Sequence, residues 1–520
     1  MTVDDRYYDV IGFGDEIPGI FALISAAREY RRRTSKYPRI LLMSKGSKLE
    51  SVGGHVVRGG LAYLDRSQIS RQLRRALGLG TFGAPPAIYR EFLQRAGVVF
   101  IALDPRQAGA ALQKMMQEAG VALIREVEID SVLKEDQRIV GIKLARGETY
   151  FGKQFIDSTV NAELAQAAGV NKLRGFETFG LPESELPVTL VFETEGISVK
   201  RLKQIEYAYL KRFTNPKDAQ AQDFIRHAAG FDQQLMTRIS KDMFDPRGNL
   251  KTMWAGRDYI DVRSPALSVA YHSFRGKKFS LAETGMILDK GNIAILPGGR
   301  LSWNALLCYV NGTQAEELAT GGGKPTSEIL EEMSFVGKWF KSFGATSVKP
   351  ASELYIRHAG NITGAVEPLS GADMLRGGVP TRQALGTFAY HFDVRGGITG
   401  IGAKADALGF KSVSFEQPIF NIGIRHAQIQ DVPNLAVVSP ASGFKGFASS
   451  AGRIVEFNVA VGQGLGIAAI IALLSDRNLA DVSNVEVRQV LVEIGQLPSV
   501  FGVAKSIAAS KLQQFETQIV

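Results

Sequence analysis

Two short stretches in the second half of the chain hold residues whose types could act on a small substrate. ELYIRHAG carries Arg357 and His358, and FAYHFDVRGG carries His391, Asp393 and Arg395. If the second stretch is an extended strand, its alternation puts His391, Asp393 and Arg395 on one face. A guanidinium there would clamp a carboxylate or carbonyl, and the imidazole would move a proton near neutral pH. The alternative is an ordinary salt-bridged, half-exposed strand.

The stretch GFGDEIPG near the N-terminus has part of the glycine spacing of a nucleotide-binding turn. The apolar run Tyr8–Ile11 predicts a buried strand, and Ile17–Arg28 predicts a helix. In a dinucleotide turn, G-x-G-x-x-G, the glycines make the turn, approach the pyrophosphate and pack the helix on the strand. Gly12 and Gly14 fit the first two places, but an isoleucine holds the third, and Gly19 comes two residues later. Alone, the stretch also fits a plain strand–turn–helix.

Asp15 and Glu16 are the unusual residues of this turn. They place negative charge at the N-terminus of the predicted helix, where a pyrophosphate needs positive potential. Other segments of the chain must therefore decide whether the turn binds a nucleotide.

The composition is that of a large α/β protein. The chain has 520 residues, of which 45% are hydrophobic and 22% charged, with 55 glycines, so it is long enough for two or more domains. Its single cysteine, Cys308, excludes a disulfide framework, a four-thiolate iron–sulfur cluster and a Cys-x-x-Cys pair. A redox role would therefore need an organic cofactor. The spacing of His, Asp and Glu predicts no metal site.

Charge and targeting signals narrow the expected partners. The net charge is +9, but the basic residues are scattered apart from a cluster at 28–39, where cations complement the dipole of the first predicted helix. Aromatic and basic residues do not interleave, so no nucleic acid is expected. The apolar stretch 459–474 is shorter than the roughly 20 residues of a membrane span and predicts a buried helix. Without a signal-peptide pattern, we expect a cytoplasmic protein of undetermined oligomeric state.

Changes in texture along the chain predict its organisation. Residues 1–168 alternate strands and helices in the order of a Rossmann-type parallel sheet with helices on both faces. The sequence pattern then changes to that of mixed strands and charged helices, which predicts an inserted α+β substrate domain at 169–420. The first texture returns at 421–475, and 476–520 is expected to be a C-terminal helical tail. Within the first part, 121–156 alternates like an antiparallel hairpin that returns to a strand.

Three separated pieces together resemble the FAD-dependent oxidoreductases with a two-domain, glutathione-reductase-like fold. The pieces are GFGDEIPG, KQFIDSTVNAELAQAAGV at 153–170, and NLAVVSPAS with AGRIVEFNVAVGQGLG at 434–466. The resemblance covers about the first 165 and the last 170 residues, and the middle only loosely. It implies that the first and last parts of the chain together bind FAD.

The resemblance also implies which residues hold the cofactor. In the family a strand ending in Asp-Ala-Thr-Gly closes over the FAD pyrophosphate, and here the corresponding residues are Asp-Ser-Thr followed by Val160. The family's last nucleotide-domain element has an arginine loop and a helix with Gly-Gln-x-x-Gly, whose N-terminus would stabilise negative charge on the flavin pyrimidine. The residues expected to bind FAD are Gly12, Gly14, Asp15, Pro18, Gly19, Ser44, Lys45, Gly53, Gly54, His55, Arg58, Gly59, Gly60, Asp157, Ser158, Thr159, Arg453, Gly462 and Gln463.

Two residues of this set, Ser44 and His55, leave more than one interpretation open. The family's glutamate at the end of the second strand, which binds the adenosine ribose, corresponds to Ser44 in LLMSKG. With Lys45 and Lys48 nearby, the alternative is the 2′-phosphate of NADP, although a second glycine-rich βα unit to hold both cofactors is missing. His55, in GGHVVRGG, raises the possibility of covalently attached FAD, against a noncovalent loop histidine.

The resemblance implies an FAD-dependent oxidoreductase that transfers a hydride between a small organic substrate and the flavin. The protein itself would supply orientation, charge and a proton acceptor or donor. The family's arginine-rich and Asp-x-His-like stretches match the two stretches described first, with Asp393-x-Arg395 in place of the second. The expected catalytic residues are His391, Arg395, Asp393, Arg357 and His358. The alternative is a noncatalytic nucleotide- or flavin-binding protein with an RNA or membrane-surface partner, suggested by the basic charge.

Overall fold

A parallel sheet forms the first half of the architecture. The computed structural model describes residues 6–395, 397–410 and 414–520. Its first sheet has the order β3-β2-β1-β6-β18, and the antiparallel strands β5 and β4 extend it from β6. The strands are β1 (Tyr7–Phe13), β2 (Ile40–Met43), β3 (Val121–Ile124), β4 (Ile129–Glu135), β5 (Arg138–Leu144), β6 (Thr149–Asp157) and β18 (Leu435–Val437). The Rossmann-type order and the hairpin that returns to a strand are both confirmed.

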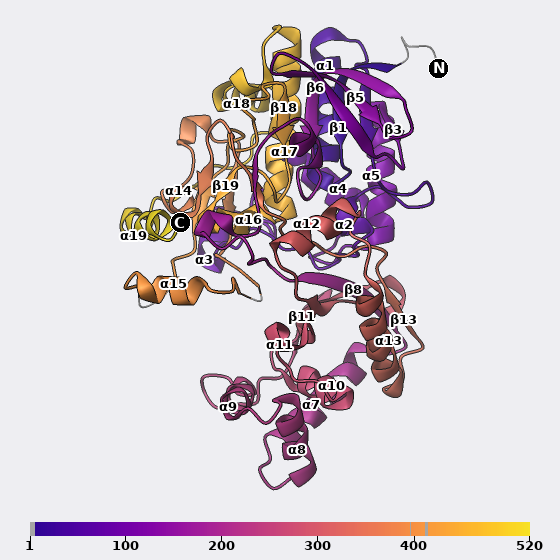
Figure 1. Ribbon diagram of the computed structural model, residues 1–520, viewed down its shortest axis with the longest axis vertical. Coiled ribbons are helices and arrows are strands. Elements are labelled where there is room, and N and C mark those ends of the chain that lie inside the picture. Colours follow the sequence, from indigo (N-terminus) through magenta and orange to yellow (C-terminus); the bar gives the residue numbers. More distant parts are fainter. Residues whose placement is uncertain (1–5, 396, 411–413) are drawn as a thin grey trace.

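Alternate residues of these strands serve two different cores. Val10 of β1 points into a core shared with three helices, whereas Ile11 points into the core on the other face. The first core packs beneath α1 (Ile17–Thr34), α5 (Pro105–Ala119) and α17 (Val455–Leu474). The second lies against the β4–β5 hairpin and α6 (Glu163–Ala167). Figure 1 shows α1, α5 and α17 around the first sheet.

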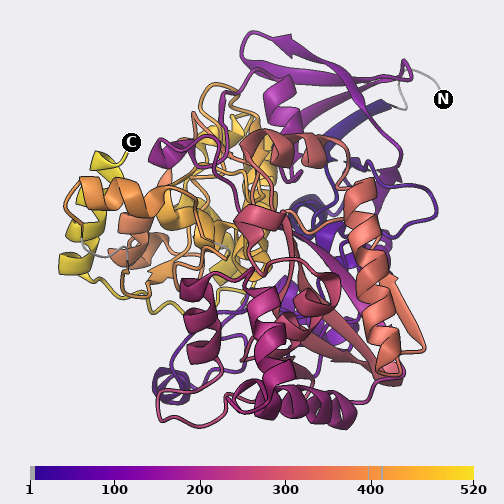
Figure 2. The ribbon, with the colours of Figure 1, turned by 60° about the horizontal axis from the view of Figure 1, so that its bottom comes forward.

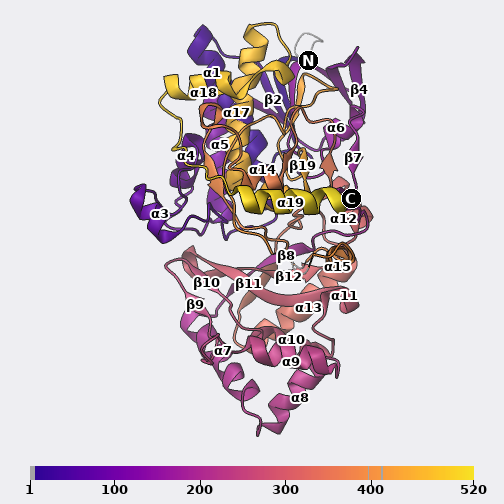
Figure 3. The same cartoon turned by 90° about the vertical axis from the view of Figure 1, so that its left-hand side faces the viewer.

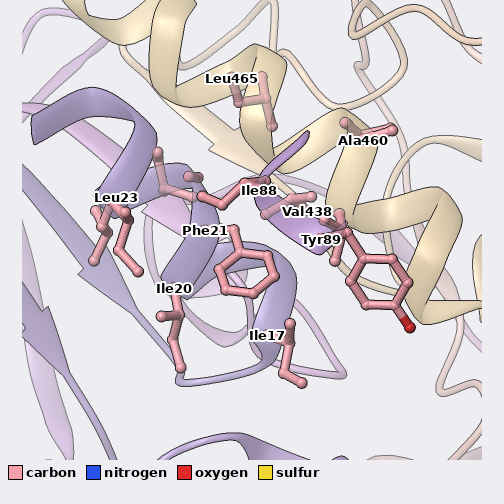
Figure 4. Close-up of a cluster of buried hydrophobic side chains, with 14 of the residues drawn as sticks. Ile17, Ile20, Phe21, Leu23, Ile88, Tyr89, Val438, Ala460 and Leu465 are labelled. Atoms are coloured by element: carbon pink, nitrogen blue, oxygen red, sulfur yellow. The ribbon is translucent and has the colours of Figure 1, made fainter. Parts of the chain in front are cut away.

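Glycines allow α1 and α17 to pack closely. A Cβ at Gly462 would come 2.3 Å from the carbonyl oxygen of Pro18, and one at Gly466 would come 2.1 Å from that of Ala22. Figure 4 shows the apolar side chains around this contact, including Leu465. Among the described residues, α17 is the one helix long and apolar enough to cross a membrane, but 89% of its most apolar window is buried. The stretch predicted to be a buried helix therefore lies in the core.

A second, antiparallel sheet forms the other half and lies below the first in Figure 1. Its order is β13-β8-β12-β11-β10-β9. The strands are β8 (Val188–Glu195), β9 (Trp254–Ala255), β10 (Tyr259–Asp261), β11 (Met286–Leu296), β12 (Arg300–Cys308) and β13 (Ser347–Pro350). These strands and their helices share an apolar core of their own.

Helices cover the far face and the lower end of the second sheet. Figure 2, in which the bottom of Figure 1 comes forward, shows several of them in front of the sheet. They are α7 (Val199–Phe213), α8 (Ala219–Ala228), α9 (Gln233–Asp242), α10 (Ala266–Arg275) and α13 (Ser327–Ser342).

The C-terminal residues pack against the segment that follows the second sheet. α19 (Ser506–Gln518) contacts α14 (Gly371–Leu375), because the Glu516 carboxylate accepts hydrogen bonds from the backbone of Gly371 and Ala372, each at 3.1 Å. Figure 3 shows α19 facing the viewer between the levels of the two sheets. The C-terminus therefore helps to hold residues 371–421 beside the first sheet.

Candidate cofactor and substrate site

In the turn between β1 and α1, the glycine pattern begins two residues later than the sequence suggests. Gly14, at φ +87°, makes the turn, and Glu16 is the N-cap of α1. A Cβ at Gly14 would come 2.6 Å from the backbone nitrogen of Thr159, and one at Gly19 would come 2.1 Å from Ser158 Oγ. The dinucleotide pattern therefore runs Gly14-x-Glu16-x-x-Gly19, with a glutamate in the second glycine's place.

Gly12 belongs to the strand and not to the turn. It lies inside β1, and a Cβ there would come 2.7 Å from Leu23 Cδ1 on α1. The expectation that Gly12 and Gly14 are the first two glycines of the pattern is thus wrong. Position 12 favours glycine because helix and strand pack closely at that point.

The loop after β6 closes directly over this turn. Ser158 Oγ donates a hydrogen bond of 2.6 Å to the carbonyl oxygen of Gly14. Asp157 is fully buried, and its carboxylate accepts from Thr159 N at 2.9 Å and from Ala165 N at 3.0 Å. Burial raises the pKa of Asp157 to about 6. The structure thus brings residues 157–159 to the nucleotide turn, as the resemblance implies.

A groove of about 640 Å³, which we call the cofactor groove, opens beside this turn at the carboxyl ends of the parallel strands. This is where open α/β sheets bind nucleotides. Carboxylates outnumber cations along it. The carboxylates are Asp15, Glu16, Glu50, Glu126, Glu128, Glu163 and Glu353, and the cations are Lys45, Arg58 and Lys324.

Part of the residue set predicted to bind FAD lines the cofactor groove. These residues are Gly14, Asp15, Lys45, His55, Arg58, Ser158 and Thr159. The other members lie behind the lining or elsewhere: Gly12, Pro18, Gly19, Ser44, Gly53, Gly54, Gly59, Gly60, Asp157, Arg453, Gly462 and Gln463.

The end of β2 holds neither an acid nor a free cation. Ser44 is fully buried, and its Oγ accepts a hydrogen bond from Gly46 N at 3.1 Å. Lys45 Nζ pairs with Glu163 at 2.7 Å and donates to the Thr320 carbonyl at 2.6 Å. Ser44 therefore stabilises a local turn, and the charge of Lys45 is already balanced.

Sequence reasoning missed three segments that line the cofactor groove. They are residues 126–129, residues 319–324 and residues 353–356. The second is the loop TGGGK after α12 (Gly312–Thr320), and its three consecutive glycines were the only available signal. Residues 126–129 have no motif, and residues 353–356 belong to ELYIRHAG, which was assigned to the substrate, so only tertiary structure places both segments here.

Arg58 and His55 contact carboxylates across the groove near the turn. Arg58 donates to both carboxylate oxygens of Asp15, at 2.5 and 2.9 Å, and its Nε donates to Glu353 at 2.7 Å. His55 Nδ1 lies 2.6 Å from Glu16 Oε2, and the His55 ring stacks on Tyr355 with centroids 5.0 Å apart. Since Tyr355 lines the next cavity, this stacked pair marks the boundary between the two.

A second cavity, of about 620 Å³, lies where the second sheet meets Arg453 and the loop 63–74. Cations dominate its lining, so we call it the arginine cavity. The cations are Arg66, Arg74, Arg357, Arg395, Arg453 and Lys505, and the carboxylates are Asp65 and Asp393.

Two of these arginines are buried to an unusual degree. Arg357 is 1% exposed and Arg453 is 4% exposed. Arg357 donates only to neutral oxygens, those of the Pro187 carbonyl at 2.7 Å and the Asn304 side chain at 3.2 Å. Burial lowers the pKa of Arg357 to about 9. Among the described residues, neither arginine's Nε has a hydrogen-bond partner, although both side chains line the cavity.

His391, Asp393 and Arg395 line one cavity, but not as a strand. The ladder of β16 (Thr387–Ala389) with β17 (Ile419–Asn421) ends at Ala389, and residues 390–395 are irregular. The predicted strand is therefore wrong. Instead, a bond of 2.5 Å between His391 Nδ1 and Gln68 Oε1 holds the loop. Asp393 pairs with Arg453 and, among the described contacts, with neither His391 nor Arg395.

His358 is not among the described residues that line the arginine cavity, and its contacts are with buried residues of the core. It is fully buried between Glu185, whose Oε1 lies 2.9 Å from Nδ1, and Asn361, whose Oδ1 lies 2.8 Å from Nε2. Burial opposes its charge, but the Glu185 carboxylate raises the pKa of His358 above its ordinary value. The ring also stacks on Phe176. The expectation that His358 faces the substrate is thus wrong, because a buried carboxylate draws it into the core.

The Gly-Gln-x-x-Gly segment of α17 packs helices and does not reach either cavity in the described structure. Gly462 meets the backbone of Pro18, and Gln463 donates to Gln496 Oε1 at 2.8 Å. The helix begins at Val455, so both residues lie well inside it. Of this family-like element, Arg453 is the residue that reaches the arginine cavity.

The fold and the site define a class: two-domain α/β proteins with a nucleotide groove at the edge of a parallel sheet and a separate cavity against an inserted domain. The family model of the FAD dependent oxidoreductases matches residues 9–491. The chain therefore belongs to that family, whose members are flavoenzymes with FAD as cofactor. No curated protein matches the chain.

Solved structures are similar only at low identity. L-proline dehydrogenase from P. horikoshii is 12% identical, with a TM-score of 0.34, covering 95% of this chain and 99% of that one. NikD, an amino acid oxidase essential for nikkomycin biosynthesis, is 9% identical, with a TM-score of 0.36 and coverages of 92% and 97%. PqsL from P. aeruginosa, in complex with 2-aminobenzoylacetate, is 11% identical, with a TM-score of 0.35 and coverages of 98% and 99%.

The cofactor groove fits FAD by its place in the fold and by its glycines. The backbone at Gly14 and Gly19 leaves no room for side chains, as a nucleotide turn requires. Lys45, Arg58 and Thr159 line the groove, with their donors bonded to Glu163, Asp15 and Asp157 respectively. The exceptions are Asp15 and Glu16, whose carboxylates lie where the family binds a diphosphate.

Proposed function

We propose that the protein is an FAD-dependent oxidoreductase that transfers a hydride between the flavin and a small organic anion bound in the arginine cavity. The observation that carries this proposal is the pair of buried arginines, Arg357 and Arg453, that line the cavity, of which Arg357 has no carboxylate partner among the described residues. Arginine binds carboxylates in a planar fork, so a carboxylate is the chemistry that this lining favours.

Energetics support an anionic ligand. A charge buried without a counterion is costly, and the described residues supply no carboxylate partner to Arg357. Arg395 and Arg453 lie close enough to lower its pKa further. An anion in the cavity would relieve both costs, whereas a cationic substrate would add to them.

The chain's own residues would position the substrate and move one proton. Bound FAD supplies the hydride acceptor or donor. Arg357 and Arg395 would orient the anionic group, and Asp393 would hold Arg453 in place. Because Gln68 Oε1 accepts from Nδ1 of His391, Nε2 is the ring nitrogen left to take up a proton. In the oxidative direction Nε2 of His391 would take up the proton that the substrate releases.

The test is an anaerobic screen of small molecules for bleaching of the flavin absorbance. We expect organic carboxylates to reduce the flavin, and inorganic sulfate or phosphate to inhibit by competition. Matched amides and amines, which lack the negative charge, should react far more slowly. A neutral or cationic compound that reduces the flavin faster than its carboxylate counterpart would refute the proposal.

A further inference from the structure

Hydrogen-bond donors gather on the loop after β2, opposite the N-terminus of α1. They are the backbone N–H groups of Gly53 and His55 and the guanidinium of Arg58, and we call them the donor cluster. Amide and guanidinium groups beside a helix N-terminus are the chemistry that binds a phosphate or diphosphate. In this chain, however, side chains of the turn already hold all three.

Glu16 fills the donor cluster from the second glycine's place. Its Oε1 accepts a hydrogen bond from His55 N at 3.0 Å. A Cβ at Gly54 would come 2.0 Å from the same oxygen, so the carboxylate fills the space over the loop backbone. Although Glu16 is the N-cap of α1, its side chain accepts no hydrogen bond from that helix. The carboxylate therefore reaches across the groove and does not cap its own helix.

Asp15 takes the rest of the donor cluster. Its Oδ2 accepts from Gly53 N at 3.1 Å, and Arg58 donates to both of its oxygens. Burial raises the pKa of Asp15, but Arg58 and the hydrogen bonds from Gly53 and Ser44 together outweigh it, so the pKa lies below the ordinary value. The carboxylate is ionised at neutral pH and balances the positive charge of Arg58.

The network also leaves a polar atom unused. His55 is 6% exposed and lines the cofactor groove, yet its Nε2 has no hydrogen-bond partner among the described residues. Buried polar atoms are normally paired, and the exceptions gather where a ligand completes the set. His55 thus marks a place where a further polar group fits.

We propose that the carboxylates of Asp15 and Glu16 occupy the diphosphate subsite of the cofactor groove and must leave it when FAD binds. FAD then competes with the chain's own side chains for the donor cluster. Because like charges in a buried groove repel, the two carboxylates weaken FAD binding relative to a chain with glycine at position 16.

The experiment measures FAD and riboflavin binding to flavin-free full-length protein by quenching of flavin fluorescence. Riboflavin is the internal control because it lacks the diphosphate. Glu16→Gly should tighten FAD binding about tenfold or more. Glu16→Gln, which removes the charge but keeps the size, should tighten it less. Glu128→Gln removes a charge from another part of the same groove and should change FAD binding less than twofold, because it does not touch the donor cluster.

Riboflavin affinity decides between the proposal and a general loosening of the groove. It should change by less than twofold in every variant, and an equal gain for riboflavin and FAD would overturn the proposal. Unchanged or weaker FAD binding in a folded Glu16→Gly protein would overturn it too. If the glycine variant does not fold, Glu16→Gln decides alone, and it must then bind FAD more tightly than Glu128→Gln does.

Discussion

The cofactor groove and the arginine cavity meet at the stacked pair of His55 and Tyr355, and they carry opposite charge. In our proposal the anionic cofactor binds in the more acidic of the two, and the substrate binds in the more basic one. The net charge of +9 gives no hint of this division. Where the charges lie along two neighbouring cavities, and not their sum, decides what each can bind.

The cations of the two cavities also differ in their partners. In the groove, Lys45 pairs with Glu163 and Arg58 pairs with Asp15, so these carboxylates largely neutralise the two positive charges. In the arginine cavity, Arg357 has no carboxylate partner among the described residues. The groove's cations are therefore neutralised by the chain's own carboxylates, whereas Arg357 has no such partner among the described residues.

Breaking the chemistry of the arginine cavity should give the largest effect. His391→Ala and Arg395→Ala should each lower turnover about a hundredfold or more, the scale of a lost proton-transfer or positioning group. Bound FAD per chain, measured by absorbance, should stay the same. His227→Ala on the exposed side of α8 is the control and should keep full activity. Loss of FAD in the first two variants would show that they act through the groove instead.

The contribution of the groove to the stability of the fold can be separated from that of the cavity by its pH dependence, because Asp157 lies buried beneath the nucleotide turn. Its folded-state pKa of about 6 lies above the ordinary value of 3.8, so it stabilises the fold fully below pH 3.8. That stabilisation is lost as the pH rises through 6. Asp157→Asn should remove this dependence, which is on the order of 2 kcal/mol between pH 4 and 7, in urea unfolding. Parallel stability curves for the two proteins would contradict this.

Removing one unpaired charge from the arginine cavity should separate binding from stability. Arg357→Met should raise KM for an anionic substrate about tenfold, the scale of one charge-assisted hydrogen bond. The same variant should melt at a higher temperature, because an apolar side chain replaces a buried and unbalanced charge. Arg226→Met on the surface of α8 should change neither value. A lower melting temperature in Arg357→Met would mean that the arginine serves the fold.

The smallest effect is expected for a cation of the groove. Lys45→Ala should weaken FAD binding less than about threefold, because Glu163 already neutralises this lysine. Equilibrium titration with FAD measures the change. A much larger loss would show that Lys45 exchanges Glu163 for the cofactor, and the two cavities would then differ less than their partners suggest.

Local patterns predicted the parts of the site that one stretch of chain builds alone. The strand, turn and helix at the N-terminus and the return of Arg453 follow from periodicity and from the family resemblance. The glycine register was missed because Gly12, which packs against Leu23, imitates the first glycine of the turn. The loop 390–395 was predicted as a strand because its alternation is real, but Gln68 and not a neighbouring strand holds it. The groove segment 319–324 has only its three consecutive glycines as a local signal, and only folding brings it beside the nucleotide turn.

The close packing of α1 on α17 sets an order for the synthesis of the protein. The apolar side of α1 is made first, and its glycine-lined partner leaves the ribosome roughly half a minute or more later, at ordinary elongation rates. During that interval the inserted domain can fold on its own apolar core, whereas the apolar side of α1 is not yet covered by α17. The N-terminal third of the nascent chain is therefore the part that most needs protection by a chaperone until residue 474 has emerged.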